Sequence, residues 1–574
     1  MSPVTAAERP WLRFYGDVPE TLEYPEVTLY EALMTSVRRT PDAVAYDFFG
    51  TTATYRKLGE EVDRFADALA SLGLGPGDRM TISMPTCPQG VIAFYAAIKL
   101  GAVASMIHPL STPGEIEGFL NRSGSRVALG LDAFYRSFGD IEGQTPLEAL
   151  ILTRIGDYLS PVKRAGFWLK KGRKIEKVPP DARIRWWSDL MKESHPSAPA
   201  AQAGVHEPAA ILYSGGTTGT PKGILLSHWN FVTEGLQVRA WIGLGPQDTI
   251  LAALPIFHGF GLAALVNAGL LSGCRLLLVP TFTPETTAEL MRTKRPTLIA
   301  GVPTLYEALV RDPALRKADL SSLRAAFSGA DSLPEPVRLG FEALVAERGG
   351  RVKLLEGYGL TEAVTGIVGM PINESRPGSI GVPFPDTLVA IFRPGEIEEA
   401  PVGEEGEICV SGPAVMLGYL DDPGATAAAL QAHPDGRTWL HTGDIGRMDE
   451  DGFFFFTSRL KRMIKSSGFN VFPSQVEATL HEHPAVAEVC VVGIPDASQG
   501  ERVVAVVVPA GGADAGDELA AELIGHCRGK LIKWSCPRDV DFVGELPKTR
   551  VGKIDFTTLT REASERRSAA VDDV

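Results

Sequence analysis

The chain has 574 residues, of which 44% are hydrophobic and 22% are charged, and its formal net charge is −14. This length predicts about four domain-sized units, and the composition is typical of an ordinary globular protein. The negative charge argues against nucleic acid as a partner, because no overall basic field attracts phosphates.

Cysteine usage and apolar stretches indicate the cellular setting. The six cysteines are scattered without C-x-x-C spacing, which favours reduced thiols of a cytoplasmic protein over disulfides or a zinc site. The first nine residues show no basic start followed by an apolar core, so we expect no secretory signal. The longest apolar stretch, residues 262–279, contains Asn267, Ser272 and Arg275. It favours a buried helix followed by a strand over a membrane span.

Hydrophobic spacing predicts alternating helices and strands in the first part of the chain. Apolar residues repeat at helical spacing over 58–72, a strand is expected at 80–84, and a second helix at 90–100. The same alternation recurs with strands at 276–279, 298–302 and 323–327. This order predicts parallel sheets with helices on both faces.

Composition also predicts the domain boundaries. Residues 194–204, rich in Ser, Pro and Ala, resemble a linker, and a second boundary is expected just after residues 453–459. Beyond it, a helix at 475–481 and strands at 486–492 and 503–508 predict a small α+β unit. The polar tail 563–574 is expected to fray.

The most informative run is residues 214–223, S-G-G-T-T-G-T-P-K-G, between two strand-like apolar segments. Glycines allow several N–H groups to point at one anion, and hydroxyls and a lysine add donors and charge. The loop therefore suits a nucleotide triphosphate. An ordinary P-loop is excluded, because that motif needs Gly before and Ser or Thr after the lysine, whereas Lys222 lies between Pro221 and Gly223. A plain Gly/Thr surface loop is the alternative.

Further motifs follow in a fixed order: residues 254–259 (L-P-I-F-H-G), 357–362 (G-Y-G-L-T-E), 442–444 (T-G-D), 459–465 (R-L-K-R-M-I-K) and 547–554 (P-K-T-R-V-G-K-I). Together with the loop, this set resembles the acyl-adenylate-forming superfamily, which holds acyl-CoA synthetases, peptide-synthetase adenylation domains and beetle luciferases. The order and spacing are similar over nearly the whole length.

The resemblance implies an α/β fold with a large N-terminal adenylation domain (1–458) of parallel-rich, helix-covered sheets plus a β-barrel-like subdomain. A hinge (459–461) and a small mobile α+β C-terminal domain (462–574) follow. It also implies a two-step reaction with domain alternation. A carboxylate first attacks the α-phosphorus of ATP to give acyl-AMP and pyrophosphate, and a thiol, normally that of coenzyme A, then displaces AMP. Such chemistry depends on positioning and charge neutralisation.

The resemblance also assigns the site residues. Those expected to bind ATP or AMP are Ser214, Thr217, Thr218, Gly219, Thr220, Lys222, Gly329, Ala330, Asp331, Glu356, Gly357, Tyr358, Gly359, Thr361, Asp444, Arg459 and Lys553. Tyr358 offers a flat face for adenine, and Asp444 accepts hydrogen bonds from the ribose hydroxyls. Glu362 holds Mg²⁺, a hard cation that prefers oxygen ligands. His258 borders and gates the acyl site. Without the resemblance, Asp444 would pass for a turn residue and Glu362 for a solvated acid.

The C-terminal assignments carry the sharpest hypothesis. Lys553 is expected to reach both the substrate carboxylate and the α-phosphate, where its charge offsets repulsion between two anions. Lys461 is the hinge residue about which the small domain rotates between half-reactions. Ser467, Gly468 and Phe469 are similar to the segment that lines the path of coenzyme A.

Among acids, the chain most resembles long-chain fatty acid–CoA ligases, so a medium- to long-chain fatty acid is expected. The segment 151–177 carries apolar residues, including Leu159, Val162, Phe167, Trp168 and Leu169, among basic ones. Such a stretch can rest on the anionic inner face of a membrane; an ordinary solvated insertion is the equal alternative. A homodimer is also left open.

Two other functions compete with a fatty acid–CoA ligase. One is an acyl-AMP ligase or stand-alone adenylation enzyme that loads a carrier protein. The other is a catalytically silent nucleotide- or lipid-binding protein. The joint presence of Glu362, Asp444 and Lys553 argues against a silent protein.

Overall fold

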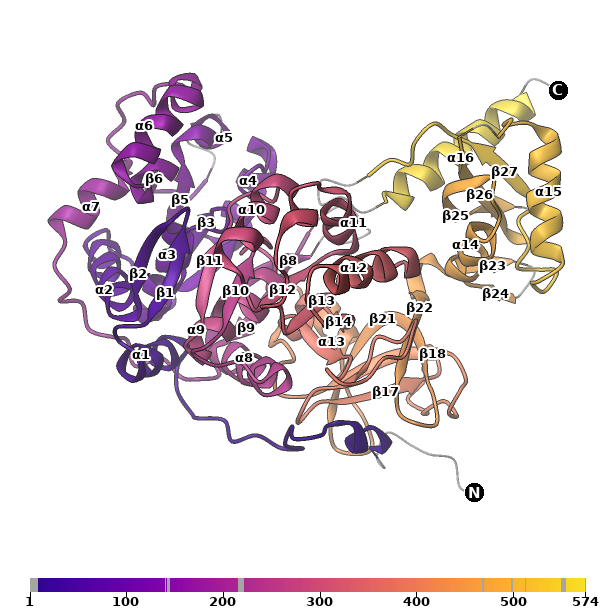
Figure 1. The fold of residues 1–574 in the computed structure, drawn as a ribbon, viewed down its shortest axis with the longest axis horizontal. Coiled ribbons are helices and arrows are strands. Elements are labelled where there is room, and N and C mark those ends of the chain that lie inside the picture. The colour runs from indigo at the N-terminus through magenta and orange to yellow at the C-terminus, as the bar shows by residue number, and fades with distance from the viewer. Residues whose placement is uncertain are drawn as a thin grey trace.

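The computed structural model describes residues 9–139, 141, 145–214, 221–466, 469–496, 499–511, 513–548 and 554–572, apart from the side chains of 461, 469, 470 and 568–572. A large N-terminal lobe holds two helix-covered mixed sheets and a smaller antiparallel sheet. A small C-terminal lobe stands apart at one end (Figure 1). The predicted fold class is confirmed.

The first large sheet is parallel in its centre and antiparallel at its ends. Its strand order is β16 (Val382–Pro383), β15 (Gly366–Gly369), β14 (Leu354–Gly359), β13 (Ala325–Ser328), β12 (Leu298–Gly301), β10 (Thr249–Ala252), β11 (Arg275–Leu278), β1 (Val44–Phe48) and β2 (Thr51–Thr54). The predicted strands at 276–279, 298–302 and 323–327 are therefore confirmed. They neighbour strands far away in sequence, as crossover connections require.

The second large sheet has the order β19 (Gly418–Tyr419), β9 (Lys222–Ser227), β8 (Pro208–Ser214), β4 (Val103–Met106), β3 (Arg79–Ser83), β5 (Val127–Leu131), β6 (Ala149–Thr153) and β7 (Ile184–Trp186). Strands β8 and β9 form an antiparallel hairpin with Ser214 opposite Lys222. Ser214 and Lys222, near the two ends of the glycine-rich run, therefore lie opposite each other in this hairpin.

Helices cover these sheets (Figure 1). They are α1 (Leu29–Arg39), α2 (Tyr55–Ser71), α3 (Pro88–Lys99), α4 (Pro113–Ser123), α5 (Tyr135–Gly139), α6 (Pro161–Lys170), α7 (Trp187–Glu193), α8 (His228–Ile242), α9 (Ala268–Ser272), α10 (Pro284–Lys294), α11 (Pro303–Arg311), α12 (Glu335–Glu347) and α13 (Pro423–Ala429). Every residue of α3 is buried, as expected for a helix that is apolar on all sides.

Helix α8 has clear local causes. Ser227 and Asn230 form a capping box, in which each side chain satisfies a backbone N–H of the other. Gly243 ends the helix with a φ of 67°, a left-handed conformation that glycine adopts without steric cost. The Asn230 side chain also donates to the carbonyls of Pro413 and Val415, at 2.8 and 2.9 Å. The start of α8 therefore holds the segment that leads to β19.

The antiparallel sheet matches the predicted barrel-like subdomain. Its strands are β17 (Leu388–Phe392), β18 (Gly406–Ser411), β21 (Thr438–Met448) and β20 (Leu430–Ala432), and β22 (Phe454–Arg459) also pairs with β21. The register of β18 against β21 shifts between Glu407 and Cys409. This irregularity is where the 442–444 motif lies.

The C-terminal lobe is the expected α+β unit. Its sheet contains β24 (Phe469–Val471), β23 (Ile464–Ser466), β26 (Gly500–Pro509), β25 (Val486–Asp496) and β27 (Asp539–Phe542), with helices α14 (Pro473–His481), α15 (Asp517–Arg528) and α16 (Phe556–Asp572). The expectation of a frayed tail from 563 is wrong up to residue 572, because α16 buries Leu559 and Ala563 against the sheet.

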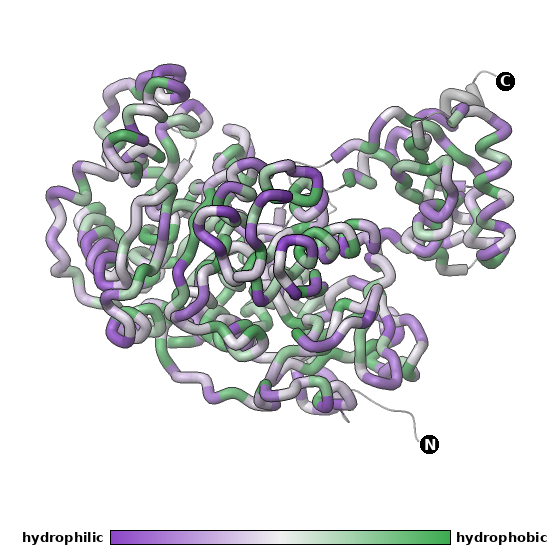
Figure 2. The backbone as a smooth tube through the Cα atoms, viewed as in Figure 1, coloured by the Kyte–Doolittle hydropathy of each residue, from purple (hydrophilic) through white to green (hydrophobic). Residues whose placement is uncertain are grey.

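The expected linker 194–204 lies outside helices and strands, yet it is held in place. Ser197 hydrogen-bonds to Asp67, and the N–H of Ala201 donates to the Lys99 carbonyl at 2.8 Å. Figure 2 shows hydrophobic stretches gathered in the interior of the large lobe. Among the described residues, no helix has the length and apolar character needed to span a bilayer.

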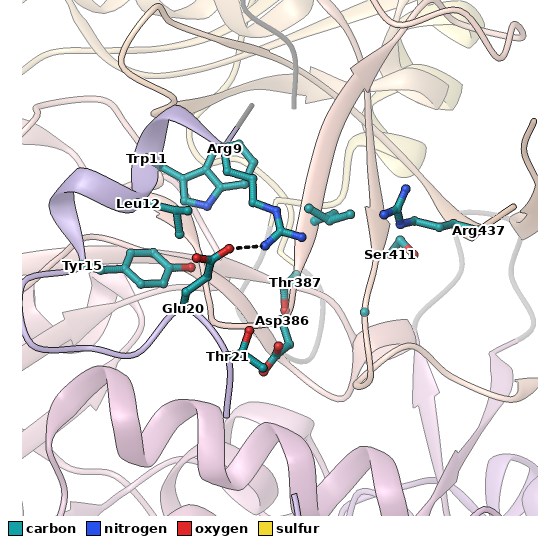
Figure 3. Close-up of a pocket in the computed structure, with 12 residues that line it drawn as sticks. Arg9, Trp11, Leu12, Tyr15, Glu20, Thr21, Asp386, Thr387, Ser411 and Arg437 are labelled. Atoms are coloured by element: carbon teal, nitrogen blue, oxygen red, sulfur yellow. Dashed lines mark hydrogen bonds and ion pairs between the residues drawn. The ribbon is translucent and has the colours of Figure 1, made fainter. Parts of the chain in front are cut away.

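The N-terminal segment packs on the antiparallel sheet and encloses a cavity of about 270 Å³ (Figure 3). Trp11 is buried, and the Tyr15 hydroxyl donates to the Pro383 carbonyl at 2.7 Å. Arg9 and Glu20 form an ion pair of 2.6 Å at this cavity. The residues that line it include none of the predicted site residues.

Candidate active site

The site lies where neighbouring parallel strands end. Strands β12, β13 and β14 run parallel, with Gly301 opposite Ser328 and Ser328 opposite Glu356. A Cβ placed on Gly329 would come within 3.1 Å of the Gly357 carbonyl oxygen. The two predicted adenine-lining segments are therefore in direct contact, at the carboxyl edge where open α/β sheets bind ligands.

Tyr358, Asp444 and Arg459 form one cluster. The Tyr358 hydroxyl donates to Asp444 Oδ2 at 2.7 Å, and Arg459 Nε lies 3.1 Å from Asp444 Oδ1. Asp444 is buried and lies opposite Arg459 across β21 and β22. Burial and the nearby Asp444 carboxylate raise the pKa of Tyr358 well above its usual value, so the hydroxyl stays protonated. The cluster presents an aromatic face beside a fixed carboxylate.

Lys222, Tyr419 and Glu362 form a second cluster. Lys222 Nζ lies 4.4 Å from the centroid of the Tyr419 ring, and the Tyr419 hydroxyl donates to Glu362 Oε1 at 3.0 Å. Burial raises the pKa of Glu362, and the Tyr419 hydrogen bond and Arg459 offset part of this rise. A cation near Glu362 would lower its pKa again. This cluster therefore suits a phosphate–metal complex.

The segment 258–260 closes the site from a third side. A Cβ on Gly259 would lie 1.8 Å from the Val364 carbonyl oxygen, and the Cβ position of Gly329 lies 3.3 Å from the Phe260 ring. Only glycine permits such a close backbone approach. The half-buried His258 ring lies 4.9 Å from that of Phe257. The structure thus brings His258 next to the Glu362 segment.

Two non-glycine residues near the site have left-handed backbones. Ala330 has a φ of 69° and Val364 a φ of 63°. A β-branched residue such as Val364 is strained in this region, at a cost of about 1–3 kcal/mol. Such strain clusters at active sites and ligand clamps. Backbone strain at Ala330, just after β13, and at Val364, just after η8 (Thr361–Ala363), supports a functional role for these two segments.

Glu356 lies beneath the adenine-lining segments. Burial raises its pKa to about 7, and the backbone N–H of Leu333, at 3.2 Å, and Arg338 offset part of the effect. Gly357, Gly359 and Thr361 follow it along β14 and the next turn, while Asp331 lies exposed just beyond Ala330. Glu356 therefore changes charge near neutral pH at the floor of the site.

Several predicted residues lie outside the described residues: Thr217, Thr218, Gly219, Thr220, Ser467, Gly468 and Lys553. Lys461 lies in the short turn η9 (Leu460–Arg462), and Phe469 begins β24, but their side chains are not described. The phosphate-loop, thiol-path and Lys553 roles therefore stay predictions.

Two residues of the site carried no motif assignment in the sequence. Tyr419 contacts both Lys222 and Glu362, and the Glu407 carboxylate accepts the Gly443 N–H at 2.8 Å and pairs with His441 at 2.9 Å. Glu407 therefore holds the irregular turn that presents Asp444. The aromatic residue after Gly418 and the acid after Gly406 were the available signals.

Comparisons with known proteins agree with this geometry. Residues 33–420 match the family model for AMP-binding enzymes, and residues 475–553 match the C-terminal domain of the same enzymes. The long-chain-fatty-acid–CoA ligase of Bacillus subtilis is 36% identical over 573 residues, covering 97% of this chain and 99% of its own. A feruloyl-CoA synthase of Amycolatopsis is 34% identical, covering 90% of this chain and 95% of its own.

Solved structures show the same architecture. ATP-bound MatB from Rhodopseudomonas palustris superposes with a TM-score of 0.81 at 27% identity, covering 94% of this chain and 99% of that one. A fatty acyl-CoA synthetase from Mycobacterium tuberculosis gives a TM-score of 0.73 at 25% identity, covering 94% and 99%. The family match, the relatives and the convergent clusters lead to one conclusion: the chain belongs to the family of AMP-binding enzymes.

Proposed function

We propose that the chain activates a medium- to long-chain fatty acid with ATP to give acyl-AMP and pyrophosphate, and then transfers the acyl group to coenzyme A. The observation that carries this proposal is the convergence of the Tyr358–Asp444 and Lys222–Tyr419–Glu362 clusters near the end of β14, with side chains contributed from all three sheets of the N-terminal lobe. Relatives that match almost the full chain are long-chain fatty acid–CoA ligases. A catalytically silent protein is not favoured.

The clusters suggest a division of roles. Tyr358 would stack on adenine and Asp444 would accept the ribose hydroxyls, while Lys222 and the loop at 217–220 would neutralise the phosphates. Glu362 would hold Mg²⁺, which supplies positive charge to the phosphate oxygens. Mg²⁺ is usually bound through one or two carboxylates plus substrate phosphates. A buried carboxylate whose raised pKa a cation would lower fits that group.

The boundaries 1–458, 459–461 and 462–574 remain part of the proposal, with Lys461 as hinge and residues 467–469 along the thiol path. Lys553 would approach the reacting carboxylate and α-phosphate during the first step only. Because its charge offsets repulsion between two anions, it matters for acyl-AMP formation and much less for thioester formation.

Replacing Lys553 by Ala tests this division. We expect acyl-AMP formation, measured as fatty-acid-dependent pyrophosphate release, to fall by on the order of 100-fold or more. Thioester formation from supplied acyl-AMP should stay near the wild-type rate. Equal loss in both steps would contradict the assignment. No pyrophosphate release by the wild type with any fatty acid would overturn the function itself.

The acceptor thiol requires its own measurement. Release of AMP that depends on coenzyme A supports a CoA ligase. AMP release only with an acyl carrier protein would support the carrier-loading alternative.

Helix α6 supports a peripheral contact with the inner face of a membrane. Val162, Trp168 and Leu169 are 82%, 56% and 53% exposed, whereas Leu159 is buried in the core. Residues 161–177 carry seven Lys or Arg and a single Glu, in a chain of net charge −14. The helix lies at the end of the molecule opposite the C-terminal lobe (Figure 1). Exposed aromatics among basic residues suit an anionic bilayer.

Flotation with vesicles of neutral or anionic lipid tests this contact. We expect binding only to anionic vesicles, and its loss when Trp168 and Leu169 are both replaced by Ser. Equal recovery with both lipids would contradict it. Sedimentation velocity would decide the open question of a homodimer against a 61.5 kDa monomer.

A further inference from the structure

A buried acid near the site has no part in the proposed mechanism. Glu234 lies in the middle of α8 and is fully buried. Among the described residues, neither of its carboxyl oxygens has a hydrogen-bond partner of normal geometry. Burial raises its pKa to about 8, and the backbone N–H of Gly366 offsets only part of this effect. Buried polar groups in native proteins are almost always paired. A partner from outside the chain would therefore satisfy the Glu234 carboxyl.

The position of Glu234 relates it to the reacting centre. Helix α8 packs along β15, since Trp241 Nε1 donates to the Met370 carbonyl at 3.3 Å at one end and Gly366 approaches Glu234 at the other. Gly366 is the direct partner of Gly359, the residue after Tyr358. The Glu234 carboxyl therefore lies next to β15, the strand that pairs with the segment of β14 expected to contact the nucleotide.

Gly366, the residue whose backbone approaches this carboxyl, packs against an aromatic ring. A Cβ added to Gly366 would meet only the Phe384 ring within 4 Å, at 3.3 Å. Phe384 in turn packs against Trp241 of α8, with ring centroids 5.0 Å apart. The Cβ position of Gly366 thus faces the Phe384–Trp241 pair, on the side where α8 packs. The π-helical turn η6 (Phe260–Asn267) also packs on α8, because Asn267 Nδ2 donates to the Phe231 carbonyl at 2.9 Å.

An unbranched alkyl chain cannot pair with a carboxyl, whereas a hydroxyl can both donate to it and accept from it. We propose that Glu234 is a specificity-determining residue that hydrogen-bonds a hydroxyl group on the acyl chain, so that the enzyme prefers hydroxylated fatty acids to plain ones. This inference rests on the proposed function. A site built to pair with a hydroxyl discriminates strongly against an analogue that lacks it, because its own polar group is then left unpaired.

The test compares kcat/KM for hexadecanoic acid with that for its 2-, 3- and 16-hydroxy derivatives, in the wild type and in Glu234→Gln and Glu234→Leu. We expect at least one hydroxy acid to be preferred by the wild type by on the order of tenfold or more. Glu234→Leu should abolish that preference while keeping activity on hexadecanoic acid. Glu234→Gln, which still offers an amide, should retain part of it.

Glu61→Gln is the matched control. Glu61 is another buried acid with a raised pKa, on α2, where it accepts from the Tyr46 hydroxyl at 2.9 Å. This variant should leave the ratio between hydroxylated and plain acids unchanged. Should Glu234→Leu give the wild-type ratio while remaining active, a water molecule rather than substrate pairs with Glu234 and the inference is wrong. Absence of pyrophosphate release by the wild type with every acid would instead overturn the proposed function.

Discussion

The Glu234→Gln variant tests, without any substrate, whether the buried Glu234 carboxyl is protonated in the folded protein at neutral pH. The pKa of Glu234 rises from 4.5 to about 8 because burial disfavours the charged carboxylate. In the unfolded chain this group ionises near its ordinary value. Between the two pKa values the folded protein therefore binds one more proton than the unfolded chain. Each pH unit in that window lowers the free energy of unfolding by about 1.4 kcal/mol as pH rises.

The magnitude follows from this window. From near pH 6 to the native pKa near 8, the wild type loses about 3 kcal/mol of stability through Glu234, and no more above it. The amide of the Gln variant does not titrate. We therefore compare the variant with the wild type at each pH. The difference in free energy of unfolding, variant minus wild type, should be larger by about 2–3 kcal/mol near pH 9 than near pH 6.

Urea denaturation followed by tryptophan fluorescence at both pH values measures this difference. Glu285→Gln, the same chemical change at an exposed position of α10, is the control and should show no such pH dependence. A Glu234→Gln stability difference that is equal at the two pH values would refute the argument, since the carboxyl would then be ionised in the folded protein throughout this range.

Three further substitutions test the site and the core. Tyr358→Phe removes the hydroxyl that donates to Asp444 at 2.7 Å. Loss of a hydrogen bond to a charged group costs about 1.5–3 kcal/mol, so the KM for ATP should rise by on the order of tenfold or more. An unchanged KM would contradict the role of this hydrogen bond in nucleotide binding. Glu362→Gln should lower pyrophosphate release by on the order of 100-fold and shift the magnesium dependence to higher concentration, whereas an unaltered magnesium titration would remove Glu362 from the metal site. Asp47→Ala breaks the buried pairing with Arg275 and Lys294 and should lower the free energy of unfolding by about 3–5 kcal/mol in urea titrations. Because these partners hold the pKa of Asp47 below its usual value, this loss of stability should shrink as pH falls below about 4. A loss of stability that does not change with pH would contradict the pairing.

Much of the fold follows from local pattern. Helical spacing over 58–72 and strand-like runs such as 298–302 lie within one element each, so sequence neighbours carry the signal. The structure has α2 at Tyr55–Ser71 and β12 at Leu298–Gly301. Polarity alone predicts a frayed C-terminal tail. It is helical up to residue 572 because the few apolar residues of α16, Leu559 among them, pack on the C-terminal sheet.

The candidate site divides in the same way. Its motif residues, such as Tyr358 and Asp444, were available from the sequence, because ordered motifs record chemistry directly. Tyr419, which joins Lys222 to Glu362, and Glu407, which holds the Gly443 N–H, were not. Glu407 lies 36 positions from Gly443 and Tyr419 lies 57 positions from Glu362, and Lys222 is further still from Tyr419 along the chain.

The sequence by itself therefore determined the alternating α/β class, the phosphate-type loop and the family resemblance. Only the tertiary structure decided which side chains pair with the motif residues. It also decided that Glu234 is buried, with no hydrogen bond of normal geometry to its carboxyl oxygens from the described residues. The physical reason is that burial and hydrogen bonding depend on elements brought together from distant parts of the chain. No periodicity within α8 reveals that its central acid faces β15.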